Sequence, residues 1–163
     1  MSLFEQIKED LNKAVKERKE TESLVLRQLL ASVLNKEKEK RYKLGREGID
    51  GKDLDDKSHL SEEELLEVVG YEAKKRRESI VEFGKGKRDD LVAKEKSELE
   101  ILEKYLPAQL GKEEIKSIAK EVIAKVGAEN QKDIGKVMAG LMPKLKGQAD
   151  GTLVGRVVRE LLS

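Results

Sequence analysis

The chain has 163 residues, of which 41% are charged and 37% hydrophobic, with three Tyr, two Phe, no Trp and a net charge of +1. This composition favours helices with wide solvated faces over a β-sheet, and the charge falls far short of the basic excess of dedicated nucleic-acid binders. The absence of cysteine excludes disulfides, thiolate catalysis and Cys-ligated metal or iron–sulfur sites.

Two helices are expected at the start of the chain. Ser2 is a good N-cap, and apolar residues recur every three or four positions after it, which predicts a helix to about Lys19. A second helix, capped by Thr21 or Ser23, repeats this spacing from Leu26 onward. It ends in a charged tail, residues 36–43, which is expected to project into water.

Residues 44–60 are expected to form a flexible loop, because they contain three glycines and four aspartates without an apolar period. The single histidine, His59, has no predicted partner there and is assigned no metal or general-base role. The aspartates do not form an EF-hand, because counting from Asp53 puts Lys57 and Ser58 where a ligand and a glycine are needed. No role is therefore assigned to this loop.

Ser61 and Glu64 form a capping box that opens a third helix, and a fourth is expected from about Asp89 to Tyr105. Pro107 forbids its continuation, so the domain boundary is placed there. These elements predict an all-α fold: an N-terminal helical domain of about four helices, residues 1–106, and a small C-terminal three-helix bundle, residues 107–163.

The three C-terminal helices are expected at residues 112–126, at 131 to about 145, and at 151–162, where Asp150 is the N-cap. Gly127 is expected to end the first of them. Residues 1–106 hold 24 basic and 26 acidic groups, a net charge of −2, whereas residues 107–163 hold 10 and 7, a net charge of +3. The mild positive excess therefore belongs to the C-terminal part.

The first candidate nucleic-acid contact is a basic run with a net charge of +5 over residues 74–88. Its basic residues are Lys74, Lys75, Arg76, Arg77, Lys85, Lys87 and Arg88. The alternative is a solvated helix in which Glu72, Glu78 and Glu82 pair with these bases one turn away. Four consecutive basic residues point around the whole helix, which weakens the interpretation as a single binding face.

The second candidate is the segment from Gly135 to Gly151. Its methionines and leucines follow a helical stripe that we interpret as core. The remaining residues are candidates for contact with a nucleic acid: Lys132, Gly135, Lys136, Gly140, Lys144 and Lys146. A glycine inside a helix is unfavourable by about 1 kcal/mol relative to Ala, so either a neighbouring helix or a nucleic-acid backbone should approach closely.

Two long stretches resemble the GatB/YqeY family, and the match is close to its stand-alone YqeY-like members. They are AKKRRESIVEFGKGKRDDLVAKEKSELEILEKYLPAQL at 73–110 and DIGKVMAGLMPKLKGQADG at 133–151. A shorter one, RQLLASVLNKE, lies at 27–37. The resemblance implies two helical domains, the second similar to the tail domain of the GatB subunit of tRNA amidotransferases, which helps to hold tRNA.

The resemblance implies a non-catalytic accessory protein that binds tRNA, with the C-terminal lysines and glycines facing it and the basic run as a second contact. A helical adaptor for an amidotransferase or a translation factor is the alternative. A contribution to carbon–nitrogen ligase activity is the third hypothesis, although the chain has nothing like the amidase or nucleotide-handling parts of that enzyme. No catalytic residue, cofactor or metal is expected, and a chain without a leader or membrane span is expected to be cytoplasmic.

Overall fold

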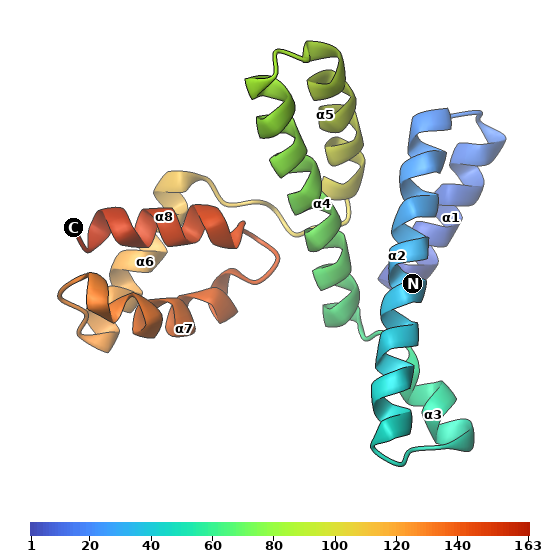
Figure 1. The fold of residues 1–163 in the computed structure, drawn as a ribbon, viewed down its shortest axis with the longest axis horizontal. Coiled ribbons are helices and arrows are strands. Elements are labelled where there is room, and N and C mark those ends of the chain that lie inside the picture. The colour runs from blue at the N-terminus through green and yellow to red at the C-terminus, as the bar shows by residue number, and fades with distance from the viewer. The chain divides into compact units, whose positions relative to one another are not determined.

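The structure, a computed structural model, describes residues 1–163 and contains eight α-helices, one short 3-10 helix and no strand (Figure 1). The expected all-α class is confirmed. The chain divides into two compact units, Met1–Tyr105 and Leu106–Ser163, each with its own buried apolar residues. None of the helices combines the length and the apolar character needed to cross a membrane.

The first unit begins with a helical hairpin of α1 (Leu3–Lys16) and α2 (Glu20–Arg46). The expected cap at Ser2 is confirmed, since its hydroxyl accepts the N–H of Glu5 at 3.2 Å and the Glu5 carboxylate accepts the N–H of Ser2 at 2.9 Å. The expected caps of α2 are wrong, because the chain reverses within three residues at Arg18, whose φ is 57°. The second helix therefore already starts at Glu20, ahead of Thr21 and Ser23.

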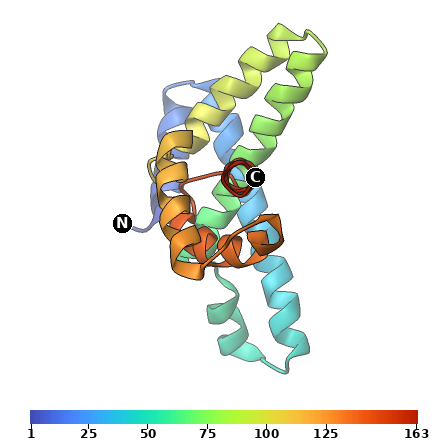
Figure 2. The ribbon, with the colours of Figure 1, turned by 90° about the vertical axis from the view of Figure 1, so that its left-hand side faces the viewer.

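The long helix α4 (Glu62–Lys85) packs beside α5 (Asp89–Glu103), as Figures 1 and 2 show. The predicted capping box is present, with the Ser61 hydroxyl accepting the N–H of Glu64 and the Glu64 carboxylate accepting the N–H of Ser61. Helices α1, α2, α4 and α5 share one apolar core. Its members are Ile7, Ala14, Val25, Leu26, Leu29, Val33, Leu65, Val68, Val69, Ala73, Ile101, Leu102 and Tyr105.

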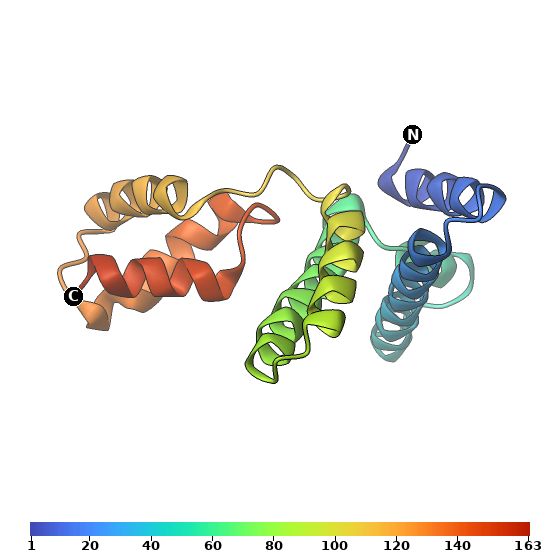
Figure 3. The same cartoon turned by 90° about the horizontal axis from the view of Figure 1, so that it is seen from above.

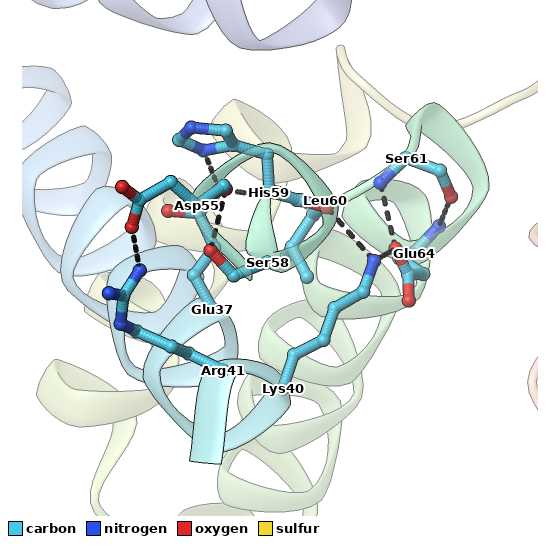
Figure 4. A network of polar contacts seen from close by, with 9 residues as sticks. All are labelled: Glu37, Lys40, Arg41, Asp55, Ser58, His59, Leu60, Ser61 and Glu64. Atoms are coloured by element: carbon cyan, nitrogen blue, oxygen red, sulfur yellow. Dashed lines mark hydrogen bonds and ion pairs between the residues drawn. The ribbon is translucent and has the colours of Figure 1, made fainter. Parts of the chain in front are cut away.

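The expected loop at residues 44–60 is wrong over most of its length. Helix α2 continues to Arg46, and a further helix, α3 (Gly51–Ser58), folds back along it. Sequence periodicity missed α3 because it buries only Ser58, whose hydroxyl donates to the carbonyl of Asp55 at 2.8 Å. Charged contacts hold it instead, among them an ion pair between Arg41 of α2 and Asp55 (Figure 4).

The end of α3 is tied to both α2 and α4 by a polar network (Figure 4). His59 does have a partner, since its Nδ1 lies 3.2 Å from Oε1 of Glu37. Lys40 donates to the carbonyl of His59 at 2.9 Å and to Glu64 at 2.6 Å. The charged end of α2 is thus part of the packed structure and does not simply project into water.

The second unit contains α6 (Lys112–Val126), the 3-10 helix η1 (Gln131–Asp133), α7 (Ile134–Leu145) and α8 (Gly151–Leu161), seen from above in Figure 3. Gly127 ends α6 in a left-handed conformation with φ 67°, as expected. The three α-helices all contact one another and enclose a separate core. It comprises Ile115, Ala119, Val122, Val137, Leu141, Leu145, Val154, Val157, Val158 and Leu162.

The segment before α6 is fastened to the turn between α7 and α8. The N–H of Leu110 donates to the carbonyl of Gln148 at 2.8 Å, and the side-chain amide of Gln109 donates to the carbonyl of Gly147 at 2.8 Å. Gly147 has a φ of 74°, and the place of its missing Cβ lies 3.5 Å from Cδ of Pro107. The turn and the incoming segment therefore pack as one piece of the second unit.

Candidate nucleic-acid interface

The 3-10 helix η1, which leads directly into α7, is capped by two side chains. The Asn130 side chain accepts the N–H of Lys132 at 3.0 Å, and Asp133 accepts the N–H of Glu129 at 3.0 Å. The N–H groups of Glu129 and Asn130 hold the pKa of Asp133 below its ordinary value. From this start, the apolar stripe Val137, Leu141 and Leu145 turns toward the core, and the other side of α7 is left to solvent.

The lysines predicted around α7 are all exposed. Lys136 lies 4.0 Å from Asp133, a weak contact for a side chain that is 73% exposed. Lys132 and Lys144 form no ion pair, and Lys146 directly follows the last residue of the helix. Between Lys136 and Lys144, Ala139 and Pro143 are exposed as well, so this face of α7 carries small residues flanked by cations.

The two candidate glycines of α7 differ in their surroundings. A Cβ on Gly140 would lie 3.1 Å from Cγ1 of Val122, so close packing of α7 on α6 accounts for this glycine. A Cβ on Gly135 would meet nothing within 4 Å, and the residue is exposed. Packing therefore explains Gly140 and leaves Gly135 without an internal reason.

Helix α8 adds two basic residues that the sequence analysis did not single out. Arg156 and Arg159 are exposed and form no ion pair. Between them and the cap at Asp150 lies Gly155, where a Cβ would again meet nothing within 4 Å. A search of the sequence for basic residues near a glycine inside each predicted helix would have found this signal, because Gly155, Arg156 and Arg159 lie within five residues.

The positive charge of the second unit is confined to one part of it. Residues 107–130, which include α6, hold four lysines and four glutamates and carry no net charge. Residues 131–163, which include α7 and α8, hold six basic and three acidic groups. Two of those acids, Asp133 and Asp150, accept backbone N–H groups at helix starts. The +3 excess therefore comes entirely from α7, α8 and the turn that joins them.

In the first unit, the basic run divides into residues with different surroundings. Arg76 is buried, and its guanidinium donates to Glu72 at 2.7 Å and to Gln28 at 2.8 Å. Glu98 of α5 lies 3.4 Å away on the other side. The Nε of Arg76 is buried without a hydrogen-bond partner. This arginine joins α2, α4 and α5 from inside and does not reach the surface.

The neighbours of Arg76 are paired with carboxylates. Lys75 lies 2.8 Å from the buried Glu72 and also over the ring of Tyr71, whereas Arg77 reaches Glu103 of α5 at 2.9 Å. Lys74 has a longer contact of 3.8 Å with Glu78. In this part of the run, the basic side chains thus form the intramolecular ion pairs expected for a solvated or packed helix.

The far end of the run lies in the turn between α4 and α5. Lys85 pairs with Glu82 at 2.7 Å. The guanidinium of Arg88 donates to the carboxylate of Asp90 from Nε at 3.0 Å and from Nη2 at 2.9 Å. The Arg88 guanidinium lowers the pKa of Asp90 to about 2. Only Lys87, which has a φ of 54°, is exposed without an ion pair.

The first unit also contains a groove of about 700 Å³ between α2 and α4. Its charged lining is balanced, with four lysines and four glutamates: Lys36, Lys40, Lys43, Lys75, Glu39, Glu64, Glu67 and Glu72. Such a lining does not attract a polyanion as a whole. No group of three or more His, Asp or Glu side chains in the chain is placed to hold a metal ion.

Comparison with known proteins gives one family and a set of fungal relatives. The family described as Yqey-like protein matches residues 4–162. The chain is similar to "Altered inheritance of mitochondria protein 41, mitochondrial" from Kluyveromyces lactis, with 37% identity over 102 residues, 63% of this chain and 47% of that protein. The protein of the same name from Saccharomyces cerevisiae S288c is 34% identical over 100 residues, 61% of this chain and 46% of its own length.

A third relative of that name, from Eremothecium gossypii, is 35% identical over 102 residues, 63% of this chain and 48% of that protein. The chain therefore spans about half the length of the curated relatives it matches. Because these relatives are named as mitochondrial, the expected cytoplasmic location stays a prediction.

Proposed function

The chain belongs to the family of Yqey-like proteins, and on that premise we propose that it is a non-catalytic accessory protein that binds tRNA through its C-terminal unit. The observation that carries the proposal is the exposed surface of η1 and α7, where Lys132, Lys136 and Lys144 are exposed without a close ion pair and Gly135 has no internal packing partner. Cations of this kind contact phosphates largely independently of sequence. A helix without a side chain at Gly135 allows a sugar–phosphate backbone to come close.

The paired residues of the basic run make a weaker contribution in this proposal. A cation that already holds a carboxylate must give up that partner before it can bind a phosphate, which offsets the gain. Lys74, Lys75 and Lys87, which extend to the surface, form at most a second contact with RNA. Arg76 serves the interior of its own unit.

The test is a titration of fluorescein-labelled unacylated tRNA, followed by anisotropy at several salt concentrations. The variant K132Q/K136Q/K144Q removes three charges from η1 and α7, and the matched control K116Q/K120Q/K125Q removes three from α6. Binding should weaken steeply with salt for the parent chain, and the α7 variant should lose more affinity than the control. Equal losses in both variants, or no tRNA affinity beyond that of an unrelated basic protein, would refute the proposal.

A second function, a helical adaptor for an amidotransferase or another translation protein, is favoured by a different surface. Leu24 and Leu34 of α2 are 45% and 52% exposed, and Ala31 between them is exposed as well. Exposed leucines on one helix suit a protein contact better than an RNA contact. Affinity capture from the source cells distinguishes the two functions, because an adaptor should retain its partner after RNase treatment and lose it in L24Q/L34Q.

A further inference from the structure

Helix α2 has a solvent-facing row of residues opposite its buried side. The buried Leu26, Leu29 and Val33 point into the core of the first unit. On the other side, residues spaced alternately by four and three positions are all exposed, and we call them the outer row of α2: Glu20, Leu24, Arg27, Ala31, Leu34 and Lys38. This spacing averages 3.5 residues, which is the repeat of helices that pack lengthwise against another helix.

The outer row is free over a limited length. The chain reverses just before its first residue, Glu20, and the residue that follows Lys38 in the same spacing is Arg41, which pairs with Asp55 of α3. Between Glu20 and Lys38 the helix extends for about 27 Å. A partner helix of that length is therefore the natural match for the row.

The two ends of the outer row carry opposite charges. Glu20 and Lys38 are exposed, and neither forms an ion pair within the chain. The rest of the helix follows the same trend, since residues 20–31 hold two acidic groups and one basic group, whereas residues 32–46 hold six basic and two acidic groups. A helix with this charge order is complementary to a copy of itself that runs in the opposite direction.

One antiparallel register satisfies both the leucines and the charges. Glu20 precedes Leu24 by four residues, and Lys38 follows Leu34 by four. When Leu24 of one chain lies against Leu34 of a copy, Glu20 therefore lies against Lys38 of that copy, and the same two contacts recur on the other side of the two-fold axis.

Near the axis, Arg27 lies against Ala31 of the copy. The small alanine leaves room for the apolar stem of the arginine, whose guanidinium can extend into solvent. Arg27 is exposed and has no ion pair to give up. A polar layer of this kind between two leucine layers also fixes the register of a helix pair.

We propose that the outer row of α2 is a homodimer surface, on which α2 of a second copy lies antiparallel with Leu24 against Leu34 and Glu20 against Lys38. The contact uses no residue of η1 or α7, so it goes beyond the proposed tRNA binding. It names a second copy of this chain as the partner of the exposed leucines.

The charge pattern favours a copy over other occupants of this surface. A strand of RNA would meet two leucines and a carboxylate at Glu20, which suit a polyanion poorly. An unrelated protein helix fits only if it carries the same leucine spacing with acidic and basic ends in the opposite order. The copy has these features already, because the outer row is complementary to itself.

The first test is sedimentation equilibrium of the full chain without RNA, from low to high micromolar concentration. We expect the mass of the parent chain to rise from 18.4 kDa toward twice that value. The variant L24Q/L34Q should stay at the mass of one chain. The matched control V15Q/V81Q removes two valines that are 46% and 55% exposed on other helices and should associate like the parent.

A charge exchange tests the register. E20K sets two cations against each other at both ends of the pair, and K38E sets two anions against each other, so each should weaken the dimer about ten-fold. The double variant E20K/K38E restores opposite charges and should recover the parent's association. This recovery is expected only for the antiparallel pair, because a parallel pair would set residue 20 against residue 20.

Cross-linking tests the orientation directly, since the parent chain has no cysteine. Leu24→Cys mixed with Leu34→Cys should form a disulfide-linked dimer in a glutathione buffer. Either variant alone should not, because its two cysteines would lie about 15 Å apart along the pair, and a disulfide needs Cα atoms within about 7 Å.

The proposal is overturned if the parent chain keeps the mass of one chain at every concentration, or if L24Q/L34Q associates as well as V15Q/V81Q. It is also overturned if E20K/K38E does not recover or if Leu24→Cys cross-links to itself. In each of these cases the proposed tRNA binding is unaffected, because RNA is absent from all three experiments. Loss of tRNA affinity in the α7 variant, conversely, leaves the dimer as proposed.

Discussion

Glu72 and Arg76 lie one turn apart on α4 and form an ion pair of 2.7 Å, in which the side chains are only 5% and 9% exposed. Around this pair, Ser32 of α2 donates to Glu72 at 2.9 Å, and Glu98 of α5 approaches the guanidinium. A charge pair buried at the meeting point of three helices is sensitive to loss of one member, because the remaining charge has no solvent to stabilise it.

Replacing Arg76 by methionine should destabilise the first unit strongly. The change leaves Glu72 and Glu98 buried without their shared cation, and the expected loss is about 3–5 kcal/mol of unfolding free energy. Lys85→Met breaks an ion pair whose partners are both 68% exposed and should change stability by less than about 1 kcal/mol. Urea unfolding followed by circular dichroism measures the stability of both variants. If both have the same unfolding free energy, the buried ion pair contributes no more to stability than the exposed one.

The same cluster should make stability depend on pH. Burial raises the pKa of Glu72, but the hydrogen bonds from Lys75, Ser32 and Arg76 outweigh it and hold the pKa below the ordinary value of 4.5. A carboxyl whose pKa is lower in the folded state stabilises the fold above the unfolded value, and this contribution disappears as the pH falls toward the folded value.

We therefore expect the stability difference between the parent chain and Glu72→Gln to be constant near neutral pH and to narrow on acidification below about 4.5. Parallel urea titrations between pH 7 and pH 3 provide the measurement. A difference that stays constant or grows toward low pH would mean that Glu72 is not held as a carboxylate in the folded chain.

The glycines of the second unit should respond to alanine in opposite directions. Gly155→Ala fills open space inside α8 and should raise the unfolding free energy by up to about 1 kcal/mol. Gly140→Ala places a methyl group 3.1 Å from Val122 and should lower the unfolding free energy by roughly 1 kcal/mol. The melting temperatures of the two variants test this prediction. If Gly140→Ala stabilises the chain, Val122 of α6 moves aside at little cost to accept the new methyl group.

Helix α3 should open before the rest of the first unit. It buries only Ser58 and depends on surface contacts such as Arg41 with Asp55, which add little stability. Hydrogen exchange read by mass spectrometry should therefore show faster exchange for residues 54–58 than for residues 25–33 of α2. Arg41→Gln should accelerate that exchange further, whereas Lys38→Gln, which removes an unpaired charge nearby, should not.

Capping residues and glycines in the sequence were sufficient to predict where most helices begin or end. The capping boxes at Ser2 and Ser61, the cap at Asp150 and the left-handed Gly127 follow from contacts within four residues, and all of them are present. Helix α3 was missed because its single half-buried leucine, Leu54, gives no period. Its support comes from α2, more than ten residues away in the chain.

Arg76 shows a second limit of prediction from the sequence, which concerns the burial of a charged side chain. Among four consecutive basic residues, composition cannot tell which one points inward. Position does give a hint, since Arg76 continues the helical line of the buried Leu65, Val69 and Ala73. The partners that make its burial tolerable, Gln28 and Glu98, lie 48 and 22 positions away and become visible only in the packed helices.

The short stretch from Leu106 to Gly111 determines where a recombinant fragment of the second unit should begin. A recombinant fragment starting at Lys112 would lack the Leu110 N–H that occupies the carbonyl of Gln148, and Pro107 would no longer cover the turn at Gly147. That turn joins the two helices on which the basic surface lies. Isotope-labelled samples for mapping RNA contacts by NMR should therefore begin at Leu106, with the complete 106–163 stretch retained.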